Sequence, residues 1–228
     1  TACIVLSDQS MGQSRAIIDR PADIAFMAKR EVPQQLDESY RRYAVTASGI
    51  SPMAIPGIPG GQYCADGLEH NPKGTPSSLA DDHYAQMDKR LKKLTGFNYG
   101  DHWAEIEGKG TTAVLTWGSC SSPVREAIGR LREEGKEVKL IAMRLLSPAQ
   151  PEKMAAALEG VERLLVIEQS HGGQFYHYLR AHYDLPSEVK SFRRPGPLPM
   201  RPKEIHDQLV NWRDRKSTRL NSVTVRSR

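Results

Sequence analysis

The sequence predicts an α/β protein whose largest folded part is a parallel sheet domain over residues 111–213. Strands and helices alternate there, and the strands are short apolar runs typical of sheets covered on both faces. Two of the helices begin at or beside a proline. Residues 29–110 are predicted to be a loop-rich connector with one helix, and residues 1–28 the remnant of a second α/β domain.

The first eight residues, TACIVLSD, predict a buried strand that ends in Ser-Asp. No second strand of comparable quality is predicted before residue 111, and a single strand cannot satisfy its own backbone hydrogen bonds. We therefore expect the rest of that sheet to lie upstream, and the chain to be a C-terminal fragment.

Proline and glycine dominate two stretches of the connector, residues 49–61 and 70–78, which predicts rigid, turn-rich loops. Such long loops are usually functional or interfacial, so we expect them to cover a surface outside this chain. Residues 79–94 then predict an amphipathic helix with charged residues opposite an apolar stripe. The stripe consists of Leu79, Tyr84, Met87, Leu91 and Leu94.

The sheet domain is predicted element by element. Strands are expected at 113–117, 138–143, 163–169 and 189–192. Helices are expected to begin near Ser122, at Pro151 and at Gln174, and a last helix carries Ile205, Leu209 and Trp212 at i, i+4 and i+7. This order implies right-handed crossovers and a parallel sheet.

The formal net charge of +5 is concentrated in residues 214–228, which lack aromatic side chains, so nucleic-acid binding is not expected. Within this tail, DRKSTRLNS resembles the translation of a sequencing-library adapter; the alternative is a disordered basic tail.

Membrane insertion and secretion are not expected, because the chain has neither a 20-residue apolar run nor a signal peptide. The cysteines Cys3, Cys64 and Cys120 lie far apart without a C-x-x-C pair, which indicates no disulfide framework, zinc site or iron–sulfur site. We expect a cytoplasmic protein without a metal site of its own.

The turn WGSCSSP follows a predicted strand and opens a helix, so its N–H groups suit an anion. It lacks G-x-G-x-x-G, and a tight turn is the preferred interpretation. Cys120 is interpreted as a buried structural thiol rather than a reactive thiolate. Glu168 and Gln169 end a parallel strand, where α/β sites form, but a structural role is favoured for Glu168.

Three segments together carry a family resemblance: RRYAVTASGISPMAIPGIPGGQY, GLEHNPKGTPSS and DKRLKKL. They are similar to the α subunits of 2-oxoacid:ferredoxin oxidoreductases, most closely the 2-oxoglutarate type. LSDQSMGQS resembles the end of that family's pyrimidine-binding domain. AVLTWGSCSSPVREAI and LLVIEQSHGGQF resemble its next domain, which is similar to the transketolase C-terminal domain. The resemblance covers residues 1–213.

The resemblance implies an enzyme that decarboxylates a 2-oxoacid with thiamine diphosphate, passes electrons to ferredoxin and forms an acyl-CoA. It places thiamine diphosphate, Mg²⁺ and the iron–sulfur cluster on or against a separate β subunit, with coenzyme A as co-substrate. The Glu that activates the cofactor and a Y-P-I-T-P-like segment have no counterpart in this sequence. No catalytic residue is therefore assigned here, and the chain alone is expected to be inactive.

Six residues are candidates for positions near the active site of such a complex. Asp8 and Gln9 end the first predicted strand, at the edge where ligands bind in α/β folds. The other four belong to the most distinctive loops of the resemblance: Arg42, Ser51, Glu69 and His70.

Three other functions stay open. A β chain of a 2-oxoacid dehydrogenase or a transketolase would share the C-terminal domain type but lack the GISPMAIPG and GLEH segments. A non-catalytic assembly or dimerisation module would associate through apolar surface. A free-standing nucleotide-binding domain would bind ATP or NAD.

Overall fold

The computed structural model describes residues 4–15, 17–20 and 30–223, without the side chains of Ser10 and residues 213–223. Two compact units divide the chain. Unit 1 comprises Thr1–Ala16 and Tyr99–Arg228, and unit 2 comprises Ile17–Asn98. The sequence predicts domain boundaries at 28/29 and 110/111. In the structure residues 104–107 pair with a strand of unit 1, so this unit includes residues before 111.

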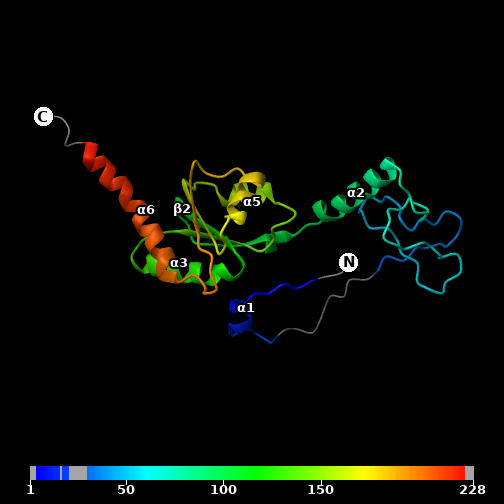
Figure 1. Ribbon diagram of the computed structural model, residues 1–228, viewed down its shortest axis with the longest axis horizontal. Helices are drawn as coiled ribbons and strands as arrows, with labels where there is room; N and C mark the ends of the chain where they lie inside the picture. The colour runs from blue at the N-terminus through cyan, green and yellow to red at the C-terminus, as the bar shows by residue number, and fades with distance from the viewer. Residues whose placement is uncertain (1–3, 16, 21–29, 224–228) are drawn as a thin grey trace. The chain divides into compact units, whose positions relative to one another are not determined.

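Unit 1 contains a five-stranded sheet with the strand order β1-β3-β2-β4-β5. Figure 1 shows the ribbon and labels strand β2 of this sheet. Its strands are β1 Ala104–Glu107, β2 Thr112–Trp117, β3 Lys139–Met143, β4 Arg163–Glu168 and β5 Glu188–Arg193. Strands β2 to β5 pair in parallel, which confirms the predicted fold class. β1 pairs antiparallel with β3 and was not predicted, because four residues with two glutamates lack an apolar run.

Helices cover both faces of this sheet, so it forms the middle of three layers. They are α3 Ser121–Glu133, α4 Pro151–Ala157, α5 Gln174–His182 and α6 Pro202–Val223, with the short 3₁₀ segments η1 Gly100–Trp103 and η2 Gly118–Cys120. Leu115 and Leu164 pack in one core with α4 and α5, whereas Val114 and Leu165 pack in the other with α3 and α6. Successive strand residues point to opposite faces, so both must be apolar.

The described residues of unit 2 form loops packed on the helix α2 Ala80–Thr95, which confirms the helix predicted over 79–94. The residues of α2 that are buried are polar: Gln86 and Lys89. The loop comes so close to this helix that a Cβ on Gly49, whose φ is +74°, would lie 2.6 Å from the carbonyl oxygen of Lys89. Only glycine fits that position.

The predicted apolar stripe of α2 is exposed in the structure. Leu79, Tyr84, Met87, Leu91 and Leu94 keep between 49% and 70% of their surface accessible. An amphipathic helix normally buries its apolar face. Here the polar contacts of the opposite face determine which side of the helix meets the loops.

The strand predicted over residues 1–8 is absent from the described residues 4–8, whose Ile4, Val5 and Leu6 are exposed. None of the described strands pairs with this segment, and an unpaired strand leaves its backbone groups unsatisfied. Residues 1–3 of that prediction lie outside the described residues. The chain instead forms α1 Gln9–Gln13 directly after Asp8.

Helix α6 continues through Val223 and so includes residues 214–223, where the sequence predicted no helix. Residues 224–228 of the predicted tail lie outside the described residues. None of the described helices is long and apolar enough to cross a membrane.

Candidate functional site

The four loop residues singled out in the sequence come together in unit 2, around Tyr43. The guanidinium carbon of Arg42 lies 5.0 Å from the centre of the Tyr43 ring, and the His70 ring stacks on the same tyrosine at 4.5 Å between centroids. Ser51 donates its hydroxyl to the carbonyl oxygen of Ala44, 2.7 Å away. We call Arg42, Tyr43, Ser51, Glu69, His70 and Lys89 the Tyr43 cluster.

Lys89 was not predicted, because it is one of several basic residues on α2. Its Nζ donates to the carbonyl oxygen of Tyr43 at 3.2 Å and to Oγ of Ser51 at 3.0 Å. Burial, with the nearby Arg90 and Arg42 charges, lowers the pKa of Lys89 to about 8. The Lys89 side chain therefore joins the loop segments at Tyr43 and Ser51 to the helix. Near neutral pH a fraction of the molecules carries an uncharged Lys89.

Glu69 holds a second connection between loop and helix. Its two carboxylate oxygens accept from both terminal nitrogens of Arg90, at 2.7 and 2.8 Å, in a bidentate ion pair. Nδ1 of His83 lies 3.3 Å from the same carboxylate. The hydrogen bonds from Arg90 hold the pKa of Glu69 at about 2, so Glu69 is ionised at any physiological pH. Arg90, like Lys89, was missed by the sequence analysis.

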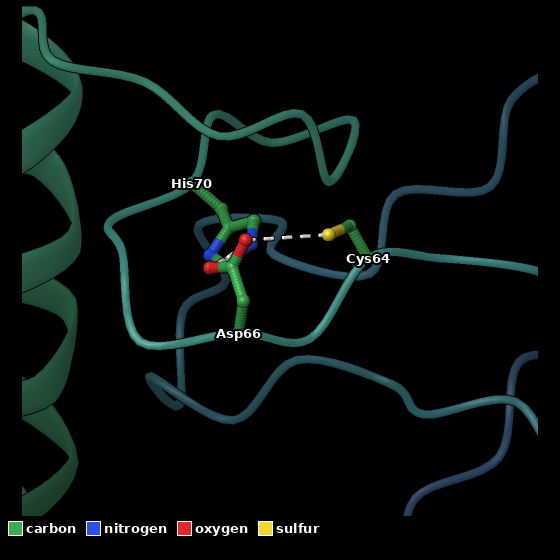
Figure 2. A group of neighbouring side chains, drawn as sticks. All are labelled: Cys64, Asp66 and His70. Atoms are coloured by element: carbon green, nitrogen blue, oxygen red, sulfur yellow. Dashed lines mark hydrogen bonds and ion pairs between the residues drawn. The ribbon is translucent and has the colours of Figure 1, made fainter.

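His70 points into a small cluster of possible ligands that the sequence analysis excluded (Figure 2). Its Nε2 lies 3.3 Å from an oxygen of Asp66, and Sγ of Cys64 lies 3.5 Å from the other oxygen. The C-x-D-x₃-H spacing on one loop carries this signal in the sequence. The search for C-x-x-C pairs overlooked it, because a mixed site needs only one cysteine.

A second candidate site lies in unit 1, where the strand order reverses. The chain leaves β2 toward β3 on one side and β4 toward β5 on the other, so the carboxyl ends of β2 and β4 flank a topological switch point. Asp8 reaches this edge: its carboxylate accepts from Oγ of Ser119 at 2.6 Å and from the backbone N–H of Met11 at 2.7 Å. Gln9 is exposed at the start of α1.

The buried groups at this edge are already occupied in structural contacts. Glu168 accepts from the backbone N–H groups of Phe175 and Tyr176, each at 2.9 Å, and from Oγ of Ser170 at 2.6 Å. Its charge thereby caps the N-terminus of α5. Burial raises the pKa of the Cys120 thiol, which keeps it protonated rather than nucleophilic.

Neither site fits the diphosphate and Mg²⁺ of a thiamine cofactor. Mg²⁺ takes carboxylates and water in octahedral geometry. At the switch point the buried carboxylate, Glu168, already accepts three internal hydrogen bonds, and in the Tyr43 cluster Glu69 is held by Arg90. No step of thiamine chemistry is therefore assigned to these residues.

Comparison with known proteins gives consistent matches. Residues 111–205 match the model of pyruvate:ferredoxin oxidoreductase core domain II. The chain is 33% identical over 157 residues to a 2-oxoacid:ferredoxin oxidoreductase α subunit of Aeropyrum pernix. This match covers 63% of this chain and 23% of that protein. It is 25% identical over 211 residues to the 2-oxoglutarate synthase subunit KorA of Methanothermobacter thermautotrophicus, which covers 91% of this chain and 55% of that subunit.

A solved structure agrees with these sequences. The 2-oxoglutarate:ferredoxin oxidoreductase of Magnetococcus marinus, with 2-oxoglutarate, coenzyme A and succinyl-CoA bound, superposes with a TM-score of 0.74 at 31% identity. The match covers 85% of this chain and 34% of that one. The chain thus spans about a quarter to about half of the length of these relatives. Residues 111–205 are thus similar to pyruvate:ferredoxin oxidoreductase core domain II, and the chain is similar to the α subunits of 2-oxoacid:ferredoxin oxidoreductases.

Proposed function

We propose that this chain is part of the α subunit of a cytoplasmic 2-oxoglutarate:ferredoxin oxidoreductase. The observation that carries the proposal is the agreement with the Magnetococcus marinus enzyme over 85% of the chain, which includes both units. The KorA match over 91% of the chain favours 2-oxoglutarate over other 2-oxoacids. The reaction is an oxidative decarboxylation that yields an acyl-CoA and sends electrons to ferredoxin.

Thiamine diphosphate would supply the electron sink for the decarboxylation. In our proposal a β subunit holds this cofactor, its Mg²⁺ and the iron–sulfur cluster. The failure of the described residues to fit a Mg²⁺-diphosphate supports that division. The contribution of this chain is a rigid sheet domain for assembly and a set of connector loops that approach the shared site.

Within the connector, we propose that the Tyr43 cluster lies near the anionic reactants. None of the described carboxylates forms an ion pair with Arg42 or Lys89, so neither basic side chain has a carboxylate in direct contact. Nε of Arg42 is buried without a hydrogen-bond acceptor among the described residues. A 2-oxodicarboxylate or the phosphates of coenzyme A would supply the missing negative charge.

The test is a co-expression of the protein that contains this chain with the proposed β subunit. We expect ferredoxin reduction that depends on both 2-oxoglutarate and coenzyme A, with pyruvate as a much poorer substrate. The 228-residue chain without its partner is expected to show no turnover. Arg42→Gln in the active complex should raise KM for 2-oxoglutarate or coenzyme A more than it lowers kcat, with Arg41→Gln as the control.

A non-catalytic assembly role is the second candidate, favoured by the exposed apolar stripe of α2. The same experiment separates the two. Co-purification with the β subunit in a complex that contains thiamine diphosphate but reduces no ferredoxin with any 2-oxoacid would support the assembly role and contradict the enzymatic proposal.

A further inference from the structure

Three possible metal ligands share one loop of unit 2. Sγ of Cys64, a carboxylate oxygen of Asp66 and a ring nitrogen of His70 all lie within 4.8 Å of one another (Figure 2). The sulfur is 3.5 Å from one oxygen of Asp66, and Nε2 is 3.3 Å from the other. The three side chains come from one loop segment, residues 64–70, and point toward one another.

These separations suit a tetrahedral ion. Zinc binds nitrogen and oxygen at about 2.0–2.2 Å and sulfur at about 2.3 Å, so neighbouring ligands around it lie about 3.3–3.7 Å apart. The separations of 3.3 Å from Nε2 and 3.5 Å from Sγ fall in that range, each to a different oxygen of Asp66, and the three ligand atoms lie within 4.8 Å of one another. A small movement of the exposed Cys64 and Asp66 side chains would place all three ligands around one ion. Cys64 and Asp66 are exposed, so a water molecule has access from solvent to a fourth position.

His70 supplies a second, independent observation. Its side chain is 3% exposed, yet Nε2 has no hydrogen-bond partner among the described residues, because its approach to Asp66 lacks hydrogen-bond geometry. A buried polar atom without a partner costs free energy, and such atoms are rare. The ring is held parallel to Tyr43, at 4° between planes, so Nε2 is aimed at the other two ligands.

We propose that Cys64, Asp66 and His70 bind one divalent transition-metal ion of the zinc type, with water as the fourth ligand. A thiolate and an imidazole favour zinc over Mg²⁺ or Ca²⁺, which prefer oxygen. On binding, the Cys64 thiol transfers its proton to solvent and the thiolate bonds to the metal. The hydrogen bond from sulfur to Asp66 is lost with this proton, and the attraction of both groups to the metal ion takes its place.

The ion would act as a clamp on the connector. It would fix residues 64–70 at three points and hold the His70 ring against Tyr43, the centre of the Tyr43 cluster. Because the unfolded loop has no preformed site, the binding free energy would stabilise unit 2. This inference does not depend on the proposed enzymatic function, and its test needs no activity.

The experiment titrates Co²⁺ and then Zn²⁺ into the reduced, metal-free 228-residue chain. We expect one Co²⁺ per chain, with the visible bands of a tetrahedral ion and a thiolate-to-cobalt charge-transfer band that Zn²⁺ abolishes. Binding should release protons and slow amide hydrogen exchange in residues 63–77. Mg²⁺ should produce neither effect.

Cys64→Ser and Asp66→Asn are the informative variants, because both side chains are exposed and neither replacement removes core packing. Each should weaken Co²⁺ binding by more than about 100-fold, beyond what the loss of an outer-shell partner costs. Cys3→Ser and Asp37→Asn are controls that should bind as the parent does. A folded chain without a Co²⁺–thiolate band, or one whose band survives Cys64→Ser, would overturn the proposal.

Discussion

The two units of the chain are stabilised in different ways. Unit 1 buries apolar side chains on both faces of a sheet, and Leu115, Leu164 and Leu165 have no exposed surface. In the described part of unit 2 the loops pack on helix α2, and the residues this helix buries are Gln86 and Lys89 rather than its leucines. Its loops are held through carbonyl oxygens, one bidentate ion pair and stacked rings.

This difference shows when an apolar pattern predicts a buried face. In unit 1, burial of apolar area is the dominant favourable term, and the helices turn their apolar residues to the sheet. In unit 2, the polar side of α2 satisfies loop carbonyl groups that would otherwise be unpaired, and this contribution decides the orientation of the helix. Four predictions test this contrast, from the largest expected effect to the smallest.

Leu165→Ala should give the largest loss of stability. The side chain is fully buried between β4 and the helices α3 and α6, so its truncation leaves a cavity in the sheet domain. We expect a loss of about 2–5 kcal/mol in the free energy of unfolding of unit 1, measured by denaturant titration. Leu198→Ala, at an exposed leucine of the same unit, is the control and should change it by less than about 0.5 kcal/mol. An equal effect of both would contradict the apolar-core description.

Glu69→Gln should destabilise unit 2 in a pH-dependent way. Because Arg90 holds the folded pKa of Glu69 at about 2, below the ordinary value of 4.5, the carboxylate stabilises the fold above pH 4.5, and this stability is lost as the pH falls toward 2. We expect a loss of about 1 kcal/mol at pH 7, since Arg90 is half exposed, and a flatter pH profile below 4.5. Hydrogen exchange of residues 43–95 would measure it.

The control for this ion pair is Asp88→Asn, an exposed carboxylate on the same helix. It should leave the exchange rates and their acid dependence as they are in the parent. If Glu69→Gln behaved like this control, the ion pair would not contribute to holding the loop on α2.

Lys89→Met should change the alkaline side of the profile. The folded pKa of about 8 lies below the ordinary value of 10.5, so the unfolded chain binds more protons between these values and the parent becomes more stable as the pH rises from 8. We expect a rise below about 1 kcal/mol between pH 8 and 9.5, because the hydrogen bonds to Tyr43 and Ser51 also favour the charged form. The variant should lose this rise, whereas Lys92→Met on the exposed side of α2 should keep it.

Leu91→Ser should have the smallest effect, in spite of its position in the apolar stripe of α2. The side chain is 58% exposed, so the change removes little buried area. We expect the stability of the chain to change by less than about 0.5 kcal/mol in thermal or denaturant unfolding. A loss above about 2 kcal/mol would show that the stripe is buried in the chain alone, and the contrast between the two units would then fail.

The sequence predicts most of the strands and helices of the sheet domain, and four of the six residues of the Tyr43 cluster. The four parallel strands and the helices α3 to α6 followed from apolar runs between proline and glycine signals. Arg42, Ser51, Glu69 and His70 were singled out by resemblance, and the structure gathers them around Tyr43. Lys89, Arg90 and the Cys64–Asp66–His70 cluster were missed, because a basic residue on a helix or a lone cysteine on a loop carries no periodic signal.

Two features were fixed by the order of residues alone: the parallel sheet between two helical layers, and the presence of a helix over residues 80–95. Both follow from local periodicity, since an apolar residue repeats every second or every three to four positions. Tertiary structure alone decided which face of α2 is buried, that residues 4–8 form no strand, and which side chains meet around Tyr43. Those outcomes depend on the pairing of polar groups that are distant in sequence, and no local pattern records which partner satisfies each of them.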